Sequence, residues 1–252
     1  MSTKKEVRVH CKFSDDIYEV VLHSLGRRNA LSYAMLADLD EHLTIAREKN
    51  ARIVIIAGAD GTFSAGADLY DLTGTIDDLA LDSAIEKVID AMLALPAPVI
   101  GAIEGACMGG AVDIALACDM LVASESAFFQ VPATRMGLLY NPRAMMRWRQ
   151  RLSGLTLRSM LLAGERLDAG AAFQTGVVSH VVPTGGALEK SHELAARILQ
   201  GTSKSVAATK GLLVALESGE TKLIRWEQLR REILASSERQ ESVNRAKKST
   251  QS

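Results

Sequence analysis

The chain has 252 residues, 48% of them hydrophobic and 23% charged, which suffices for a sizeable core in one large domain or one domain with an appendage. The basic residues are scattered and the formal net charge is −1, so we expect no nucleic-acid partner. Three cysteines without a CxxC pair indicate reduced thiols in a cytoplasmic protein without a metal site, and the lack of a long apolar run predicts neither a signal peptide nor a membrane span.

The first part of the chain begins with a predicted strand pair and a helix. Residues 7–11 and 17–23 have the composition of strands, and polar residues at 14–16 form the turn between them. A helix is expected from about Tyr33, with Ser32 as its N-cap. Leucines recur at helical spacing at positions 36, 39 and 43.

Two later segments share one pattern, a buried strand followed by a loop of small residues. The β-branched run 52–58 leads into the loop 59–68, and the apolar run 98–103 leads into the turn 104–110 and a helix over 111–118. Glycine lets a ligand approach bare backbone, and the first turn of a helix has unpaired N–H groups. Two such loops on neighbouring parallel strands would direct two N–H groups at one point, where an anion or a developing oxyanion binds. The alternative is plain packing of helix and strand against glycine.

The rest of the chain has the pattern of short strands followed by helices. We expect a helix over 77–94, strands over 120–124 and 128–131, an irregular loop over 132–143, a helix to about 163, a short helical segment at 167–172, a strand over 177–183, and helices from 187 to the end with breaks at 201 and 218–219. The last residues, 245–252, are expected to fray.

Two sets of side chains on these helices suggest surfaces. Five arginines fit a solvated helix face or a subunit contact better than a phosphate site; they are Arg143, Arg147, Arg149, Arg151 and Arg158. An apolar stripe on the final helix must dock on the body of the protein or on a partner subunit. It consists of Leu223, Trp226, Leu229, Ile233 and Leu234.

Several segments also resemble a known family when they are taken together and in order. They are RRNALS (27–32), FSAGADL (63–69), PVIGAIEGACMGGAVDIALACDM (98–120), the loop with Met136, Gly137 and Leu138, LLAGERLDAGAAFQTGVVSHVVP (161–183), and Lys210. In this combination the chain resembles the crotonase family of enoyl-CoA hydratases and isomerases. The resemblance implies an α/β fold, a spiral of ββα units over residues 1–190, and a helical region over 191–252 that builds a homotrimer or a dimer of trimers.

The same resemblance implies a substrate and a site. The substrate is an acyl-CoA thioester, so coenzyme A enters as part of the substrate and no tightly bound cofactor is expected. The backbone N–H groups of Ala67 and Gly110 would form an oxyanion hole around the thioester carbonyl, which stabilises an enolate. The implied contacts to coenzyme A are Arg28, Ala65, Ala67, Asp68 and Leu69.

The chain departs from the family at its two acid–base positions. Typical hydratases use two glutamates that share a water molecule, and the corresponding positions here are Asp113 and Ala133. Aspartate is one methylene shorter, and alanine has no acid–base capacity. Asp113 should lie in the first turn of the helix 111–118, where the helix dipole and free N–H groups keep a carboxylate ionised. It is therefore either an acid–base group or a structural cap.

A tyrosine gives a second interpretation. Tyr140 lies in the loop 137–141, which is similar to the GVPYN-type loop of methylmalonyl-CoA decarboxylases, where the tyrosine helps to hold the carboxylate of the substrate. The alternative is an aromatic side chain that packs the loop, and His23 and His180 are also interpreted as structural. The hypotheses are thus a hydratase or isomerase that uses Asp113, a decarboxylase or lyase that uses Tyr140, and a catalytically weakened protein that binds coenzyme A esters.

Overall fold

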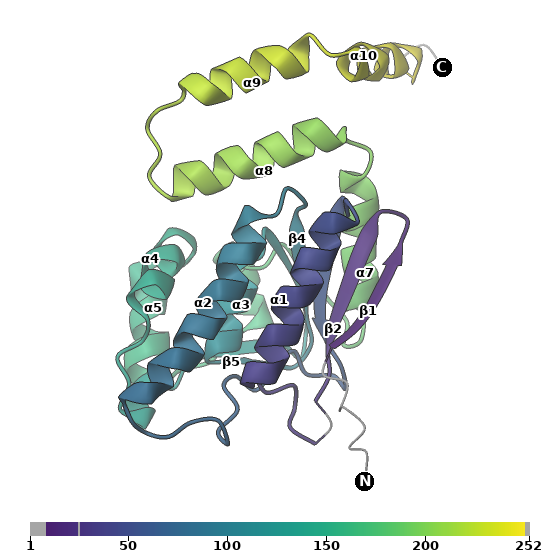
Figure 1. The fold of residues 1–252 in the computed structure, drawn as a ribbon. Coiled ribbons are helices and arrows are strands. Elements are labelled where there is room, and N and C mark those ends of the chain that lie inside the picture. Colours follow the sequence, from purple (N-terminus) through teal and green to yellow (C-terminus); the bar gives the residue numbers. More distant parts are fainter. Residues whose placement is uncertain (1–8, 25, 250–252) are drawn as a thin grey trace.

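The computed structural model describes residues 9–24 and 26–249, and its centre is a six-stranded sheet (Figure 1). β1 pairs antiparallel with β2, and the later neighbours pair in parallel. This confirms the predicted N-terminal strand pair, although its positions 7 and 8 lie outside the described residues. The strand order is β1 (Val9–Ser14), β2 (Ile17–Leu22), β3 (Ile53–Gly58), β4 (Val99–Ile103), β6 (Met120–Ser124) and β9 (His180–Val182).

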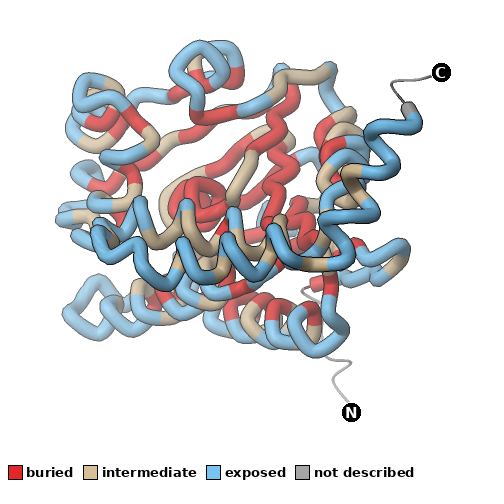
Figure 2. Tube along the Cα trace, turned by 90° about the horizontal axis from the view of Figure 1, so that it is seen from above, coloured by how far each residue is buried: buried red, intermediate tan, exposed pale blue. Residues whose placement is uncertain are grey.

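Helices cover both faces of this sheet, which explains why β3 is apolar throughout. Val54 and Ile56 belong to the larger core, which packs against α1 (Tyr33–Glu48), α2 (Leu79–Ala94) and α3 (Gly110–Ala117). Ile53 and Ile55 belong to a smaller cluster with α7 (Ala187–Ile198) on the opposite face. Figure 2 shows the buried residues concentrated in the middle of the molecule and the exposed residues around them. The predicted strand with two buried faces is therefore confirmed.

The predicted helix starts are also observed. The Ser32 hydroxyl accepts a hydrogen bond from the Met35 N–H and caps α1, as predicted. α2 begins after a short 3₁₀ turn, η1 (Ile76–Asp78). The second strand–loop–helix segment folds as β4, then β5 (Ala106–Met108), then α3, which is one of the expected ββα units.

The segment between β7 (Phe128–Gln130) and β9 differs from the prediction. The expected irregular loop contains a 3₁₀ turn, η2 (Ala133–Met136), and the start of α4 (Pro142–Arg151), which the Asn141 side chain caps. The expected helical segment at 167–172 begins as β8 (Leu167–Asp168), because these residues pair with β7, and α6 (Ala169–Gln174) follows. Together β5, β7 and β8 form a second, three-stranded sheet. Between α4 and β8 lie α5 (Gly154–Arg158) and the π turn η3 (Ser159–Ala163).

Three helices at the C-terminal end lie beside the main body (Figure 1): α8 (Ser203–Glu217), α9 (Ile224–Leu234) and α10 (Ser237–Ser249). The apolar stripe therefore belongs to α9, the last helix but one, because the helix is interrupted at residues 235–236 before α10 begins. The prediction of fraying from residue 245 is wrong up to residue 249, which ends α10, and residues 250–252 lie outside the described residues. The division into residues 1–190 and 191–252 stays a prediction.

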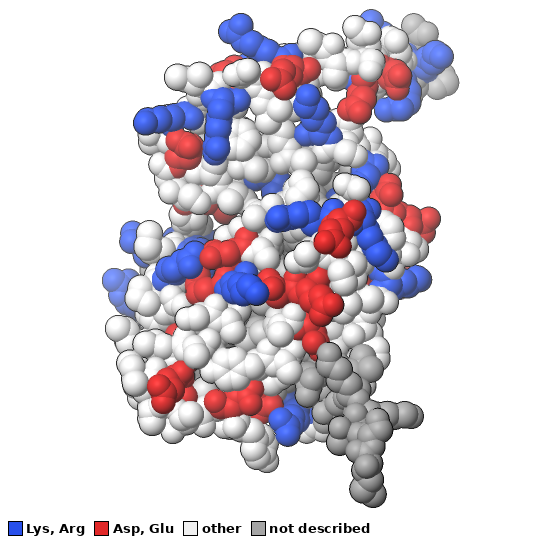
Figure 3. All heavy atoms as spheres, in the orientation of Figure 1, with Lys and Arg blue, Asp and Glu red and all other residues white. Residues whose placement is uncertain are grey.

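The surface and the helices give two further findings. Basic and acidic side chains are interspersed on the face shown in Figure 3, without a continuous basic patch. In the described part of the chain, no helix combines the length and the apolar character that a membrane crossing requires.

Candidate functional site

The two predicted glycine loops lie against each other at the carboxyl ends of β3 and β4. The Ser64 N–H donates to the Ala106 carbonyl at 3.0 Å, and the Met108 N–H donates to the Ser64 carbonyl at 3.1 Å. Gly66 approaches the second loop so closely that a Cβ atom there would lie 2.6 Å from the Met108 carbonyl oxygen. The pairing of two strand–loop units, predicted from the sequence, is thus observed.

Asn29 holds the first loop in place, a role that the sequence analysis missed. Its side chain is buried and donates to the carbonyls of Ala59 and Thr62 at 2.9 and 2.7 Å. Its Oδ1 atom accepts from the Ser24 N–H at 3.1 Å. Asn29 has a φ of 57°, a conformation that asparagine tolerates better than most residues. The asparagine in RRNALS was the available signal.

The two N–H groups of the predicted oxyanion hole lie at the ends of these loops. Leu31 forms a parallel bridge with Ala67, in which it bonds to the groups on either side, Gly66 O and Asp68 N, at 2.8 and 3.1 Å. The Ala67 N–H is therefore not part of this ladder. Gly110 is the first residue of α3, so its N–H has no partner within the helix. The pairing of these two N–H groups on one oxygen remains a prediction.

Asp113 lies one turn into α3, as predicted, and its carboxylate is buried. Two side chains of α4 bind it. Arg147 Nη2 donates to Asp113 Oδ1 and Oδ2 at 3.0 and 2.9 Å, and Trp148 Nε1 donates to Oδ1 at 3.0 Å. Arg147 also donates to both oxygens of Glu86 on α2, at 3.0 and 2.6 Å. One guanidinium therefore joins two buried carboxylates.

This environment changes the expected chemistry of Asp113. Burial raises the pKa of Asp113 to about 6, and the nearby Arg147 and Trp148 oppose this increase. The prediction that the carboxylate caps the helix is not supported, because Asp113 accepts its hydrogen bonds from the side chains of Arg147 and Trp148 and not from the first N–H groups of α3. Loss of hydration outweighs the helix dipole here. The resulting pKa is close to neutral pH, which suits a group that transfers protons.

The roles of Glu86, Arg147 and Trp148 were not predicted. Arg147 was assigned to a solvated face or a subunit contact, yet it lies between two carboxylates inside the molecule. Its partners are 61 and 34 positions away in the sequence, so local spacing does not reveal them. The only local signal was an acidic residue, Glu86, between the apolar Ile85 and Ile89.

Tyr140 also lies near this cluster. The Tyr140 hydroxyl donates to the Gly109 carbonyl at 3.1 Å, and its ring packs on Trp148 with centroids 4.9 Å apart. Burial raises the pKa of Tyr140 well above its ordinary value, so the phenol stays protonated. Ala133 is buried in η2. Tyr140 therefore lies beside the second glycine loop, where either predicted role is compatible with its position.

The predicted coenzyme A contacts lie in the first loop and in the segment beside it. Arg28 is exposed, and its carbonyl accepts from the Ala65 N–H at 2.9 Å. Leu69 is exposed, whereas the Asp68 carboxylate is buried and accepts from Arg27 at 2.7 Å. The Asp68 side chain thus shapes the loop, and the five residues remain predicted contacts.

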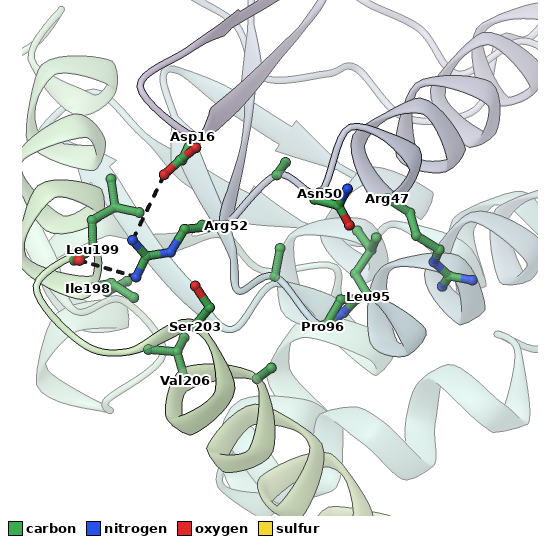
Figure 4. A pocket seen from close by; sticks show the side chains of 13 residues that line it. Asp16, Arg47, Asn50, Arg52, Leu95, Pro96, Ile198, Leu199, Ser203 and Val206 are labelled. Carbon is green, nitrogen blue, oxygen red and sulfur yellow. Dashed lines mark hydrogen bonds and ion pairs between the residues drawn. The ribbon is translucent and has the colours of Figure 1, made fainter. Parts of the chain in front are cut away.

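The cavity in Figure 4, of about 350 Å³, lies at the opposite end of the sheet, where β3 and β4 begin. Arg52 donates to the Leu199 and Gly201 carbonyls at 3.2 and 2.5 Å and lies 3.9 Å from Asp16. These bonds satisfy carbonyls after the end of α7, so we assign Arg52 to structure. Within residues 9–24 and 26–249, no group of three or more histidine, cysteine, aspartate or glutamate side chains is arranged to hold a metal ion.

Known proteins resemble this chain along most of its length. The profile of the enoyl-CoA hydratase/isomerase family matches residues 12–251. The chain is 30% identical over 209 residues to the 2,3-dehydroadipyl-CoA hydratase of Escherichia coli, which covers 79% of this chain and 82% of that protein. It is 31% identical over 216 residues to the mitochondrial Delta(3,5)-Delta(2,4)-dienoyl-CoA isomerase of Rattus norvegicus, with 79% and 65% covered. The crystal structure of an enoyl-CoA hydratase from Bacillus anthracis matches with a TM-score of 0.86 at 27% identity, over 96% of this chain and 97% of that chain.

Proposed function

Since the chain belongs to the enoyl-CoA hydratase/isomerase family, we propose that it converts acyl-CoA thioesters through an enolate whose oxygen binds between the Ala67 and Gly110 N–H groups. Coenzyme A enters as part of the substrate, and the reaction needs no separate cofactor. Each backbone donor stabilises the charge that develops on the thioester oxygen, and loss of one such donor costs about 10²–10³ in rate.

We further propose that the reaction is a double-bond isomerisation. Hydration by a pair of carboxylates needs a second acid–base group, and Ala133 supplies none. Glu86 shares Arg147 with Asp113, but both of its oxygens are paired with arginine. Isomerisation requires one group that removes a proton from one carbon and returns it to another. The observation that carries the proposal is Asp113, buried one turn from Gly110 with a pKa of about 6, which can alternate between the two protonation states near neutral pH.

A panel of thioesters tests the proposal. Purified protein is incubated with trans-3-hexenoyl-CoA, crotonyl-CoA, malonyl-CoA and methylmalonyl-CoA, and the products are separated by chromatography with CO₂ measured in parallel. We expect conversion of the 3-enoyl thioester to the 2-enoyl thioester, with kcat lowered about 10²–10⁴-fold in Asp113→Asn. Asp90→Asn is the matched control, because Asp90 is an exposed carboxylate that contacts Arg143 and not Asp113.

Other outcomes contradict parts of the proposal. Full activity of Asp113→Asn would exclude Asp113 as the proton-transfer group. CO₂ release that is lost in Tyr140→Phe would replace isomerisation by decarboxylation, for which the Tyr140 hydroxyl beside Gly109 is suitably placed. Tight binding of the thioesters without turnover would leave a protein that only binds coenzyme A esters.

We also propose a homotrimer, alone or as a dimer of trimers. The support is the apolar surface of the C-terminal helices, where Leu223, Ile224 and Leu234 are 46%, 84% and 53% exposed. Large exposed apolar side chains in one region are typical of interaction surfaces. Sedimentation equilibrium should give three or six times the mass of the chain, and Ile224→Glu should lower it. A monomeric mass at micromolar concentration would contradict the assembly.

A further inference from the structure

Two side chains of α4, Arg147 and Trp148, hold the Asp113 carboxylate by hydrogen bonds. Arg147 binds Glu86 through Nη1 and Nη2, and its Nη2 atom also donates to both oxygens of Asp113. We propose that Arg147, held by Glu86, is a positioning residue that fixes the orientation and the charge of the Asp113 carboxylate. This inference rests on the proposed function, in which Asp113 transfers the proton.

Burial makes this interaction strong. The exposed fractions of the side chains are 3% for Asp113, 9% for Glu86 and 19% for Arg147. A carboxylate in such surroundings has lost most of its hydration, which disfavours its charged form unless a cation or hydrogen-bond donor replaces the water. Arg147 supplies the cation for both carboxylates. Removal of the guanidinium therefore leaves Asp113 with the Trp148 N–H as its side-chain donor and Glu86 with Arg143 as its cation.

The hydrogen bonds also distinguish the two oxygens of Asp113. Oδ1 accepts from Arg147 and from Trp148, whereas Oδ2 accepts from Arg147 alone. A carboxylate oxygen has two lone pairs, so Oδ1 is saturated and Oδ2 keeps one lone pair for a proton. The geometry thus assigns Oδ2 as the atom that receives the substrate proton, because the indole and the guanidinium prevent the carboxylate from rotating.

The position of α4 is itself fixed against α3. Arg151, one turn after Arg147, donates through Nη1 to the Cys118 carbonyl at the end of α3, at 2.6 Å. Arg147 holds the first turn of α3 and Arg151 its last, so the guanidinium of Arg147 has a defined place relative to the glycine loops. Because Arg147 is already held in one position before the substrate binds, it loses little conformational entropy when the substrate binds.

Charged and titratable groups of several elements surround this cluster, and each affects the proton affinity of Asp113 or its neighbours. Arg147 lowers the pKa of Asp113 and Glu86 raises it, while Arg143 lies 3.2 Å from Glu86 without contacting Asp113. The facing groups are Asp82 and Glu86 from α2, Tyr140 from the segment before α4, Arg143 and Arg147 from α4, and Cys107 from β5.

These contacts predict shifts of opposite sign in two variants. A base must be deprotonated, so the acid limb of the kcat/KM profile follows the pKa of Asp113. Arg147→Gln removes the stabilising cation, and the limb should move to higher pH by about one to three units. Glu86→Gln removes a repelling charge, and the limb should move to lower pH by about one unit. A general loss of packing would not shift the two variants in opposite directions.

Three further variants serve as controls. Arg143→Gln removes a cation from the same helix, one turn away, that contacts Glu86 and not Asp113, so its limb should move much less. Arg147→Lys keeps the charge but not the forked geometry, and should restore part of the shift. Trp148→Phe removes the indole N–H from Oδ1 together with part of the ring that packs on Tyr140, so it should raise the acid limb slightly and lower kcat.

The pKa of Asp113 is measured independently of activity by NMR titration of protein carrying ¹³C-labelled aspartate carboxyl carbons, with the signal assigned by its absence in Asp113→Asn. Opposite shifts in Arg147→Gln and Glu86→Gln support the inference. Equal titration of Asp113 in the wild type, Arg147→Lys and Glu86→Gln would overturn it, even if Arg147→Gln does not fold. If Asp113→Asn keeps full activity while the NMR shifts are present, Asp113 is not the proton-transfer group. The inference that Arg147 controls the charge of Asp113 would still hold.

Discussion

Gly66 lies where the two glycine loops meet, and two features of its geometry exclude a side chain. Its φ is +87°, and a Cβ atom would lie 2.6 Å from the Met108 carbonyl oxygen. The carbonyl belongs to the backbone and cannot rotate away as a flexible side chain would. Gly61 offers a comparison within the same loop, because its φ is +67° but a Cβ atom there would meet nothing within 4 Å.

Gly66→Ala and Gly61→Ala should therefore differ. Gly61→Ala carries only the cost of left-handed backbone, about 1–2 kcal/mol of unfolding free energy, and should keep its turnover. Gly66→Ala adds the clash with the second loop, for a total of about 3 kcal/mol. It should also lower kcat about 10²–10³-fold, because it displaces the Ala67 N–H. Urea unfolding and turnover of trans-3-hexenoyl-CoA measure both effects, and equal losses in the two variants would contradict this account.

Among the elements, those with strong periodicity could be predicted from the sequence. α1 has leucines at helical spacing and a serine N-cap, and both were found where expected. β3 has only apolar side chains because alternate residues enter two different cores. Residues 167–168 were assigned to a helix because their local pattern is helical, but pairing with β7 makes them a strand. A two-residue strand depends on its partner, which no local pattern contains.

The α4 helix shows the same limit in the site. Several arginines follow one another there, and spacing alone does not tell which of them turn inward. Arg147 does so because α2 and α3 present Glu86 and Asp113 at that point. The repeated strand–loop pattern therefore predicted that the two glycine loops meet, whereas Ala67 and Gly110 came from the family resemblance and remain predicted site residues. The side-chain part depends on contacts between elements far apart in the chain.

At the scale of the molecule, the topology explains why the site forms at one edge of the sheet. β3 and β4 are parallel neighbours, so the loops that follow them emerge at the same edge, as in other parallel sheets. This was predicted from the order of strand and loop segments. The helices α8 to α10 lie beside the body (Figure 1). The sequence analysis singled out one of the side chains that join them to it, only through a family resemblance.

That side chain is Lys210, the one residue of α8 that is buried. Its Nζ donates to the Met92 and Ala97 carbonyls at 3.0 and 2.9 Å and lies 2.9 Å from Asp119 Oδ2. The ammonium thus joins α8 to the end of α2, the start of β4 and the end of α3. A buried cation with three oxygen partners is costly to remove, because its partners remain buried without a donor.

Lys210→Met should therefore loosen the C-terminal helices from the body. Methionine has a similar length but no charge, so the loss of unfolding free energy should be about 3–5 kcal/mol. Lys204→Met is the control, because Lys204 is half-exposed and lies 3.6 Å from Glu232, a surface pair worth about 0–1 kcal/mol. Hydrogen exchange should show faster exchange in α8 for Lys210→Met before β3 and β4 are affected, since those strands keep their own core. Unchanged protection of α8 in this variant would mean that other contacts hold the C-terminal helices in place.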